Sequence, residues 1–390
     1  MIYLDNAATT PLHPNAKAAM LPYLTEIYAN PSSVYSSARH VRKAIGEARQ
    51  ITAQAISATP AEIFFTAGGT EADNWALKGV LEAAEPKGKH IITSSIEHPG
   101  ILNMCRHLEA KGYDVTFLPV DTKGFVQPSQ VEDAIRQDTC LISIMLANNE
   151  VGTIQPIEEI SKITRAHKII FHTDAVQAVG HIPVNVDKLG VDLLSISAHK
   201  FYGPKGIGGL YIRKGTPISS LFYGGAQERG RRAGTENAMG IVGMGAALSA
   251  TCKALPAEQR RLTILRDKLI NEILSTIPHT QLNGAIEESK RLPGNVNVSF
   301  RFIEGESLLL HLDMHNCYAS TGSACSSGAL EPSHVLMAMG MNHELANGAI
   351  RFTLGRENTD DDIYKLMKIL YPTVQKLRDL SPLYDDYKNS

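Results

Sequence analysis

Cys325 is the residue best placed to act as a nucleophile, because it lies in a stretch of small polar residues, 320–328. A free thiol with a pKa of about 8.5 is only a few per cent thiolate at neutral pH, so it needs a group nearby that activates it. The other four cysteines lie in or beside apolar or helical segments, where cysteine is usually a buried small hydrophobe: Cys105, Cys140, Cys252 and Cys317. The sequence therefore predicts one reactive thiol, on a loop.

A second reactive group, Lys200, ends a predicted strand. Alternation along that strand places Ser195, Ser197 and His199 on one side, where Ser197 and His199 can bind phosphate oxygens. A lysine at a strand end can condense with an aldehyde, although a lone lysine is more often a solvated surface charge. Lys205 is an alternative, but it follows a Gly-Pro pair that indicates a turn.

Asp174 and Gln177 follow another predicted strand. A carboxylate at a buried strand end is unfavourable unless a cation pairs with it. The protonated ring nitrogen of pyridoxal phosphate is such a cation, and the pairing lets the ring accept electrons from a carbanion. Gln177 can reach the phenolic oxygen of the same ring. The alternative for Asp174 is a cap on a following helix.

The segment 68–71, Gly-Gly-Thr-Glu, lies between a predicted strand and a predicted helix. Glycines let the backbone approach an anion, and a helix N-terminus offers unpaired N–H groups. Gly69 and Thr70 are therefore candidate phosphate ligands, although the same residues also make an ordinary turn with Thr70 as the helix cap. Because ligands collect beyond the carboxyl ends of strands in open α/β sheets, these clusters are expected to meet.

Three further residues complete the candidate site. His98 can stack on an aromatic ring or cap a helix, and Asn149 can donate to a ring oxygen or form a turn. Arg351, in a strand-like run, can hold a carboxylate with two parallel hydrogen bonds. Arg356 is an alternative for that role. The arginine cluster of segment 229–235 is similar to a nucleic-acid-binding patch, but it is short, lacks interleaved aromatic residues and lies in a near-neutral chain, so a solvated loop is expected there.

The elements that must position these residues alternate between short apolar runs and helical patterns, which predicts a mostly parallel, mixed sheet flanked by helices. Strands are expected at 63–65, 90–93, 115–118, 141–146, 169–172, 193–197 and 209–212, and helices at 41–56, 71–84 and 157–166. Residues 258–274, 306–315 and 360–377 are further expected helices, and 295–300 alternates as a strand does.

We expect two domains, because the pattern changes near Pro256. Residues 16–255 form a large α/β domain, and residues 1–15 with 256–390 form a smaller α+β domain that carries the cysteine loop. The site is expected between them.

Composition agrees with a globular enzyme of the cytoplasm. The 390 residues include 43% hydrophobic and 20% charged side chains and carry a formal net charge of −2, which favours neither nucleic acid nor an anionic membrane as partner. The N-terminus has no signal-like apolar core, and the odd number of cysteines without metal spacing is typical of free thiols in a reducing compartment.

These motifs together resemble the cysteine desulfurases, fold-type I pyridoxal phosphate enzymes of the aminotransferase class V group. The resemblance extends over nearly the whole chain, and its long cysteine segment is similar to that of the group that serves iron–sulfur cluster assembly and tRNA thiolation. One departure follows Asn30-Pro31-Ser32-Ser33, where the family has a histidine and then a glycine and this chain has residues 34–38, Val-Tyr-Ser-Ser-Ala.

The resemblance implies a role for each residue. Lys200 would bind the cofactor's aldehyde and move the substrate's α-proton, and His98 would stack on the ring and move protons. Asp174 would pair with the ring nitrogen, and Arg351 would hold the substrate carboxylate, with Asn149 beside it. The other expected cofactor contacts are Gly69, Thr70, Asn149, Gln177, Ser197 and His199, together with Thr235, which would reach the cofactor phosphate of a neighbouring subunit.

The resemblance also implies a reaction and partners. Sulfur from L-cysteine would pass to Cys325 as a persulfide, leaving L-alanine, and then to an iron–sulfur scaffold or another acceptor protein. The enzyme would be a homodimer with shared sites and no resident metal, with Cys325 able to become a transient ligand of an iron–sulfur cluster. Alternatives are a selenocysteine lyase or an aminotransferase on the same fold, and a scaffold protein without activity.

Overall fold

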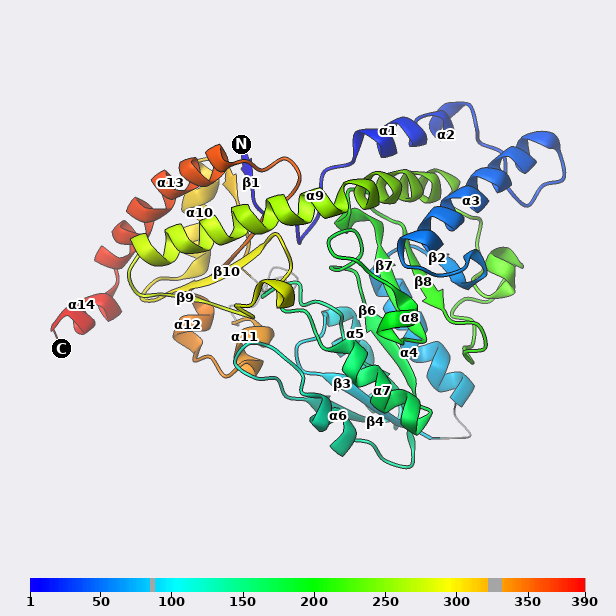
Figure 1. The fold of residues 1–390 in the computed structure, drawn as a ribbon, viewed down its shortest axis with the longest axis horizontal. Coiled ribbons are helices and arrows are strands. Elements are labelled where there is room, and N and C mark those ends of the chain that lie inside the picture. The colour runs from blue at the N-terminus through cyan, green and yellow to red at the C-terminus, as the bar shows by residue number, and fades with distance from the viewer. Residues whose placement is uncertain (85–87, 322–331, 390) are drawn as a thin grey trace.

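The computed structural model describes residues 1–84, 88–321 and 332–389. Its largest layer is a seven-stranded sheet in the order β2-β8-β7-β6-β5-β3-β4 (Figure 1). All neighbouring strands are parallel except β8, which is antiparallel to β2 and β7. The strands are β2 (Ile63–Thr66), β3 (His90–Ser94), β4 (Asp114–Leu118), β5 (Thr139–Ser143), β6 (Ile170–Asp174), β7 (Leu193–Ser197) and β8 (Gly208–Ile212).

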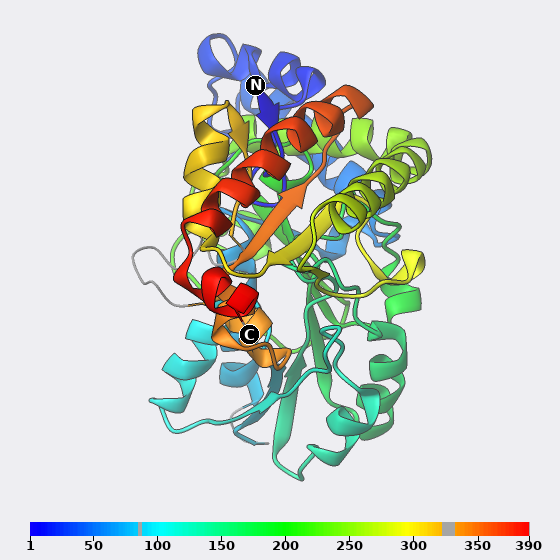
Figure 2. The same cartoon turned by 90° about the vertical axis from the view of Figure 1, so that its left-hand side faces the viewer.

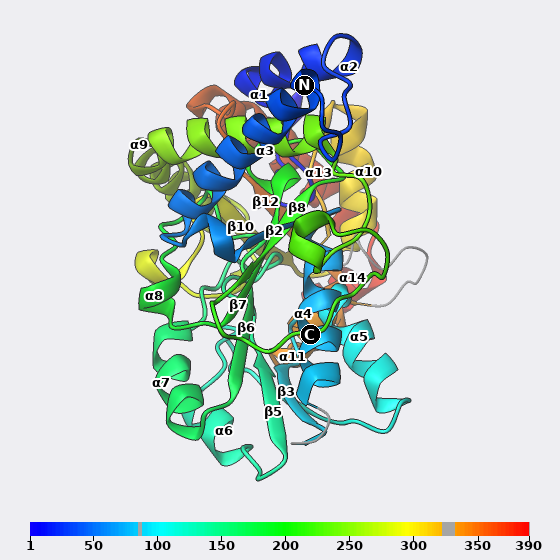
Figure 3. The same ribbon diagram turned by 90° about the vertical axis from the view of Figure 1, so that its right-hand side faces the viewer.

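Both faces of this sheet are buried: successive residues of a strand pack in two different hydrophobic cores, one on each face. Ile92, Ile142 and Leu194 pack in one core, whereas Ile91 and Leu141 pack in the other. Successive side chains of a strand point to opposite faces, so consecutive apolar residues require a cover on each side. Figure 3 shows α4 and α5 on one side of the sheet and α6, α7 and α8 on the other.

The helices of this part of the chain follow the predicted alternation with the strands. They are α1 (Pro14–Met20), α2 (Pro22–Thr25), α3 (Ser36–Ala55), α4 (Gly69–Ala84), α5 (Pro99–Glu109), α6 (Pro128–Asp133), α7 (Ile157–His167) and α8 (Val186–Leu189), with short 3₁₀ turns at Pro60–Glu62, Ala198–Lys200 and Gln227–Gly230.

A smaller unit with its own core packs beside the large sheet (Figure 2). Its three-stranded sheet has the order β12-β10-β9, and β1 at the N-terminus pairs in parallel with β11. Its elements are β1 (Ile2–Tyr3), β9 (Thr280–Leu282), a 3₁₀ turn at Glu288–Lys290, β10 (Asn295–Phe300), α10 (Gly305–Met314), β11 (Cys317–Tyr318), α11 (His334–Ala338), α12 (His343–Asn347), β12 (Ala349–Thr353), α13 (Asp360–Asp379) and α14 (Pro382–Asn389).

Helix α9 (Ala238–Thr276) connects the two units and contains Pro256 without ending there. Its first half contributes Ile241 and Met244 to a core of the large sheet, and its second half contributes Leu265 and Leu269 to the core of the small unit. Among the described helices, α9 is the one long and apolar enough to cross a membrane, a property that a core helix of a soluble protein shares. The division of the chain at residues 255 and 256 stays a prediction.

The mixed α/β fold was predicted correctly, but two local expectations were wrong. The expected strand 141–146 ends at Ser143. The strand expected to place His199 beside Ser195 and Ser197 ends at Ser197, and residues 198–200 form a 3₁₀ turn. After Ser143 the apolar residues 144–147 follow, and Ile144 and Leu146 still donate backbone hydrogen bonds to β6.

Candidate active site

A cavity of about 240 Å³ brings the predicted polar clusters together. It lies beyond the carboxyl ends of β6 and β7 and beside the N-terminus of α4. Its lining includes nine of the residues predicted from the sequence: Gly69, Thr70, His98, Asn149, Asp174, Gln177, Ser197, His199 and Lys200, with Arg351 as a tenth. Small-molecule sites of about 300 Å³ or more are common at such strand edges.

Lys200 lies in the 3₁₀ turn that follows β7, and its amine enters the cavity. The Nζ atom donates hydrogen bonds to the carbonyl oxygens of Ala7 (2.7 Å) and Ala8 (2.8 Å). The N-terminal segment therefore forms one wall of the site and orients the lysine.

Asp174 is the last residue of β6, and its side chain is buried. Its Oδ1 atom accepts a hydrogen bond from the backbone N–H of Val176 (2.9 Å) within a turn, so it caps no helix, contrary to the alternative. Burial raises the pKa of Asp174, while the nearby His98 and Lys200 lower it. A cation against this carboxylate would stabilise the ionised form, as the protonated nitrogen of a pyridine ring does.

The predicted phosphate site is built around the first turn of α4, a helix of 16 residues. A side chain at Gly69 would bring its Cβ within 2.8 Å of Val176 Cγ2 and 3.4 Å of Ser197 Cβ, so only glycine fits. Ser197 is buried, Thr70 is exposed at the entrance, and His199 contacts Thr9 Oγ1 at 3.2 Å. Burial, with Lys200 and Lys205 close by, lowers the pKa of His199 to about 4. A helix N-terminus and neutral donors suit a phosphate.

His98 both lines the cavity and caps helix α5, so the two alternatives are combined in one residue. Its Nδ1 atom accepts a hydrogen bond from Gly100 N–H (3.0 Å), which leaves the proton of the neutral ring on Nε2. Burial lowers the pKa of His98, Asp174 raises it, and Lys200 and His334 lower it. The net lowering keeps the ring uncharged at neutral pH.

Arg351 lies in β12 and is buried in the cavity wall. Its guanidinium donates to the carbonyl oxygen of Asn149 (3.0 Å) and forms an ion pair with Asp5 (3.0 Å). The buried Nε atom has no hydrogen-bond partner among the described residues. Such a charged donor favours an anionic ligand. Arg356 pairs with Glu357 and does not line this cavity.

The sequence reasoning did not identify Asp73, which lines the same cavity and is fully buried. Burial, and then the charge of Asp174, raise the pKa of Asp73 well above its usual value. Its position four residues after Gly69 on α4 places it on the same helix face, which is the sequence signal that would have revealed it.

Gln177 is buried, and its Nε2 atom donates to the carbonyl oxygen of Ala7 (3.0 Å). Thr235 is exposed in the loop before α9 and does not line this cavity. Cys325 lies outside the described residues. The ends of its segment are placed beside the site: Ser320 exchanges backbone hydrogen bonds with Arg351, and His334 contacts the carbonyl oxygen of Glu97.

Three of the four other cysteines are buried, as the sequence predicts, and the fourth is only half-buried. Cys105, Cys140 and Cys317 are buried, and Cys252 is half-buried. Burial raises the pKa of Cys105 and of Cys317 to about 12, that of Cys140 to about 11, and that of Cys252 to a smaller extent. All four are therefore protonated at neutral pH and poor nucleophiles.

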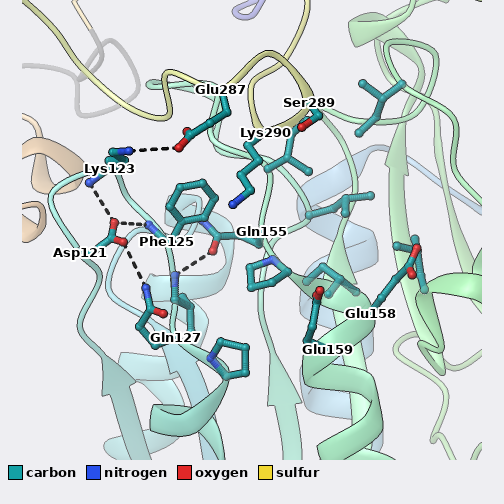
Figure 4. Close-up of a pocket in the computed structure, with 18 of the residues that line it drawn as sticks. Asp121, Lys123, Phe125, Gln127, Gln155, Glu158, Glu159, Glu287, Ser289 and Lys290 are labelled. Carbon is teal, nitrogen blue, oxygen red and sulfur yellow. Dashed lines mark hydrogen bonds and ion pairs between the residues drawn. The ribbon is translucent and has the colours of Figure 1, made fainter.

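A larger cavity of about 730 Å³ lies elsewhere, between the segment 121–128, the start of α7 and the turn at Glu288–Lys290 (Figure 4). Phe125 and Gln155 lie inside it, and Lys123 pairs with Glu287 at its edge. It contains none of the predicted site residues. Within the described ranges, no group of three His, Cys, Asp or Glu side chains could hold a metal ion.

The fold and the lining of the smaller cavity are those of a pyridoxal phosphate enzyme, and the chain belongs to the class V aminotransferases, whose family model matches residues 2–366. It is similar to the cysteine desulfurase IscS of Dictyoglomus turgidum, with 56% identity over 99% of this chain and 98% of the relative.

Two solved structures share the fold. A NifS-like protein superposes with a TM-score of 0.90 at 38% identity, covering 96% of this chain and all (100%) of that one. A protein described as SspA in complex with cysteine superposes with a TM-score of 0.81 at 38% identity, covering 91% and 99%. The predicted family, fold and cofactor are therefore confirmed.

Proposed function

We propose that this chain is a cysteine desulfurase that takes sulfur from L-cysteine onto Cys325 and leaves L-alanine. The observation that carries the proposal is the gathering of Lys200, Asp174 and the first turn of α4 around one cavity. The Cys325 segment starts from that cavity's wall, because Ser320 is bonded to Arg351. Cys325 follows Ser320 by five residues in the sequence.

The residues present fit pyridoxal phosphate. Lys200 would bind its aldehyde and Asp174 its ring nitrogen, while Gly69, Thr70, Ser197 and His199 would hold its phosphate. His98 would lie against the ring, and Gln177 and Asn149 would contact the ring oxygen. When bound, the cofactor supplies an electron sink that makes the α-proton of the amino acid acidic.

The chain's own groups then carry out the remaining steps. Arg351 holds the substrate carboxylate, and the Lys200 amine takes the α-proton. The Cys325 thiolate attacks the substrate sulfur, so an S–S bond forms as the C–S bond breaks. The electron pair of that C–S bond stays on the β-carbon of the substrate, which takes up a proton and becomes a methyl group. Lys200 returns a proton to the α-carbon, which completes L-alanine. The sulfur leaves on Cys325 as a persulfide.

We expect substitution of Arg351 to weaken substrate binding more than it slows turnover. Losing charged hydrogen bonds of about 1.5–3 kcal/mol would raise the KM for L-cysteine about 10- to 100-fold in Arg351→Gln. Steady-state kinetics measure this, and Asp5→Asn is the matched control, because it removes the ion-pair partner but keeps the guanidinium. An unchanged KM in Arg351→Gln would show that the carboxylate binds elsewhere.

The lowered pKa of His98 predicts a pH dependence. A histidine with an ordinary pKa becomes charged as the pH falls through about 6.5. Because the pKa of His98 is lowered, its ring stays uncharged at that pH and becomes charged only in more acidic solution. The pH profile of kcat/KM should therefore stay level around pH 6.5 and fall at more acidic pH. In His98→Gln that acidic fall should disappear, and its persistence would assign the fall to another group.

The proposed enzyme is a cytoplasmic homodimer that passes its sulfur to acceptor proteins, for iron–sulfur cluster assembly or tRNA thiolation. Support for a second copy comes from large exposed apolar side chains close to the loop that ends at Thr235. Tyr223 is 85% exposed in that loop, and Val34 is 86% exposed before α3. The name of the Dictyoglomus relative supports the role in sulfur supply.

Mass spectrometry of the Cys325 peptide, alkylated after incubation of the cofactor-loaded enzyme with L-cysteine, tests the proposal. We expect one added sulfur on Cys325, none on the other four cysteines, and L-alanine as the co-product. A keto acid instead of alanine, with Cys325 unmodified, would make the chain an aminotransferase and reject the proposal.

A further inference from the structure

Thr235 lies in the loop of residues 213–237, which connects β8 to α9. Part of this loop has backbone angles that are unfavourable for residues other than glycine. Glu228 and Arg229 have φ angles of 46° and 59°, two consecutive non-glycine residues in the left-handed region. Such conformations persist where surrounding contacts impose them, and they are enriched at functional sites. The contacts that impose this one are two ion pairs.

The first ion pair joins the middle of the loop to helix α3, and its carboxylate also accepts a hydrogen bond from strand β2. Glu228 is 5% exposed and accepts hydrogen bonds from Arg49 at 2.6 and 2.7 Å. The same carboxylate accepts the backbone N–H of Phe65 (2.9 Å). The loop is therefore held to the strand that leads into the first turn of α4.

The second ion pair fixes the end of the loop to the predicted phosphate site. Arg232 donates two hydrogen bonds to Glu71, from Nε (2.8 Å) and Nη2 (3.0 Å). Glu71 directly follows Thr70, and its Oε2 atom also accepts the backbone N–H of Ala67 (2.8 Å). Glu71 therefore links the turn that precedes α4 to Arg232, which lies three residues before Thr235.

We propose that Arg232, anchored on Glu71, is a positioning residue that holds Thr235 in place to bind the cofactor phosphate in the second subunit of the dimer. The inference rests on the proposed shared sites. Thr235 is exposed and does not line the cavity of its own subunit, as the proposed contact with a second subunit requires. In each subunit, the first turn of α4 then holds the loop that completes the phosphate site of the other subunit.

The test uses heterodimers in which one subunit carries Lys200→Ala, so that the absorbance of the lysine-bound cofactor reports only the other subunit's site. With Arg232→Gln placed in the Lys200→Ala subunit, we expect the dissociation constant of pyridoxal phosphate at the intact site to rise about tenfold, as for one lost charged hydrogen bond. With Arg232→Gln in the subunit that keeps Lys200, it should change less than twofold.

Matched variants separate positioning from folding. Glu258 and Arg261 form another partly buried ion pair with two hydrogen bonds. Glu258→Gln removes that pair and should leave the dissociation constant of pyridoxal phosphate unchanged in either subunit. Arg232→Lys keeps the charge but loses the paired geometry, so it should recover only part of the affinity. Equal weakening from both placements of Arg232→Gln would mean a general structural role and overturn the inference.

The outcomes also distinguish this inference from the proposed function. If Thr235→Ala in the Lys200→Ala subunit leaves the dissociation constant unchanged, or if no mixed dimer forms, the shared-site proposal fails and the inference fails with it. If Thr235→Ala weakens cofactor binding at the other site and Arg232→Gln does not, only the positioning role is wrong.

Discussion

A Cys325→Ala variant is expected to bind pyridoxal phosphate and L-cysteine normally but to lose sulfur release, with kcat lower by roughly 10³-fold or more. The reason is that none of the other four thiols can replace it. Burial raises the pKa of Cys105 and Cys317 to about 12, so neither ionises at neutral pH. Sulfide release in the presence of a reductant, alongside cofactor absorbance, measures both properties.

Cys252→Ala is the matched control for this experiment, because Cys252 is the least buried of the four described cysteines. Its activity should equal that of the unmodified enzyme. Full turnover in Cys325→Ala would remove the persulfide carrier from the mechanism, whereas loss of activity in both variants would indicate a general sensitivity to cysteine replacement.

Replacing Lys200 is expected to have the second large effect. Lys200→Ala removes the proton-transfer group, which contributes about 10²–10⁴-fold to rate, and also the covalent attachment of the cofactor. Kcat should fall by at least that factor, and the absorbance of the lysine-bound cofactor should be missing even at saturating pyridoxal phosphate. Single-turnover measurement of α-proton exchange in deuterated water separates the proton transfer from cofactor loss.

Lys205→Ala provides the control, because Lys205 was the alternative lysine in the sequence. It is exposed, does not line the cavity, and should keep full activity. If Lys205→Ala lost the cofactor absorbance and Lys200→Ala kept it, the assignment of the cofactor lysine would be reversed.

Sequence patterns predicted the sheet because its strands carry consecutive apolar residues that both faces must bury. They also predicted most of the cavity lining, because carboxyl ends of parallel strands converge: Asp174 ends β6 and Lys200 follows β7. The pattern placed two strand ends too late. Near Leu146 the apolar run and its backbone hydrogen bonds to β6 extend past Ser143, and near His199 the alternation of polar residues extends past Ser197 into the 3₁₀ turn.

Contacts between distant segments could not be predicted from local patterns. The spacing of Asp73 from Gly69 indicates its helix face but does not reveal that the charge of Asp174 raises its pKa, and nothing near Glu71 reveals its pairing with Arg232. The arginine cluster of segment 229–235 was expected to be a solvated loop, whereas Arg232 is tied to the partly buried carboxylate of Glu71 and the guanidinium of Arg229 lies 4.1 Å from the centre of the Phe64 ring. Such pairings follow from the tertiary fold alone.

The pairing of β1 with β11 has a consequence for synthesis. Ile2 is made long before its strand partner, Cys317. At about 5–20 residues per second, the N-terminal strand waits on the order of 15–60 s for that partner. Ala7 and Ala8, which orient Lys200, follow directly after this strand. The large unit can therefore fold before Cys317 has been made, but the wall beside Lys200 closes only after β11 is available, so the site is incomplete until then.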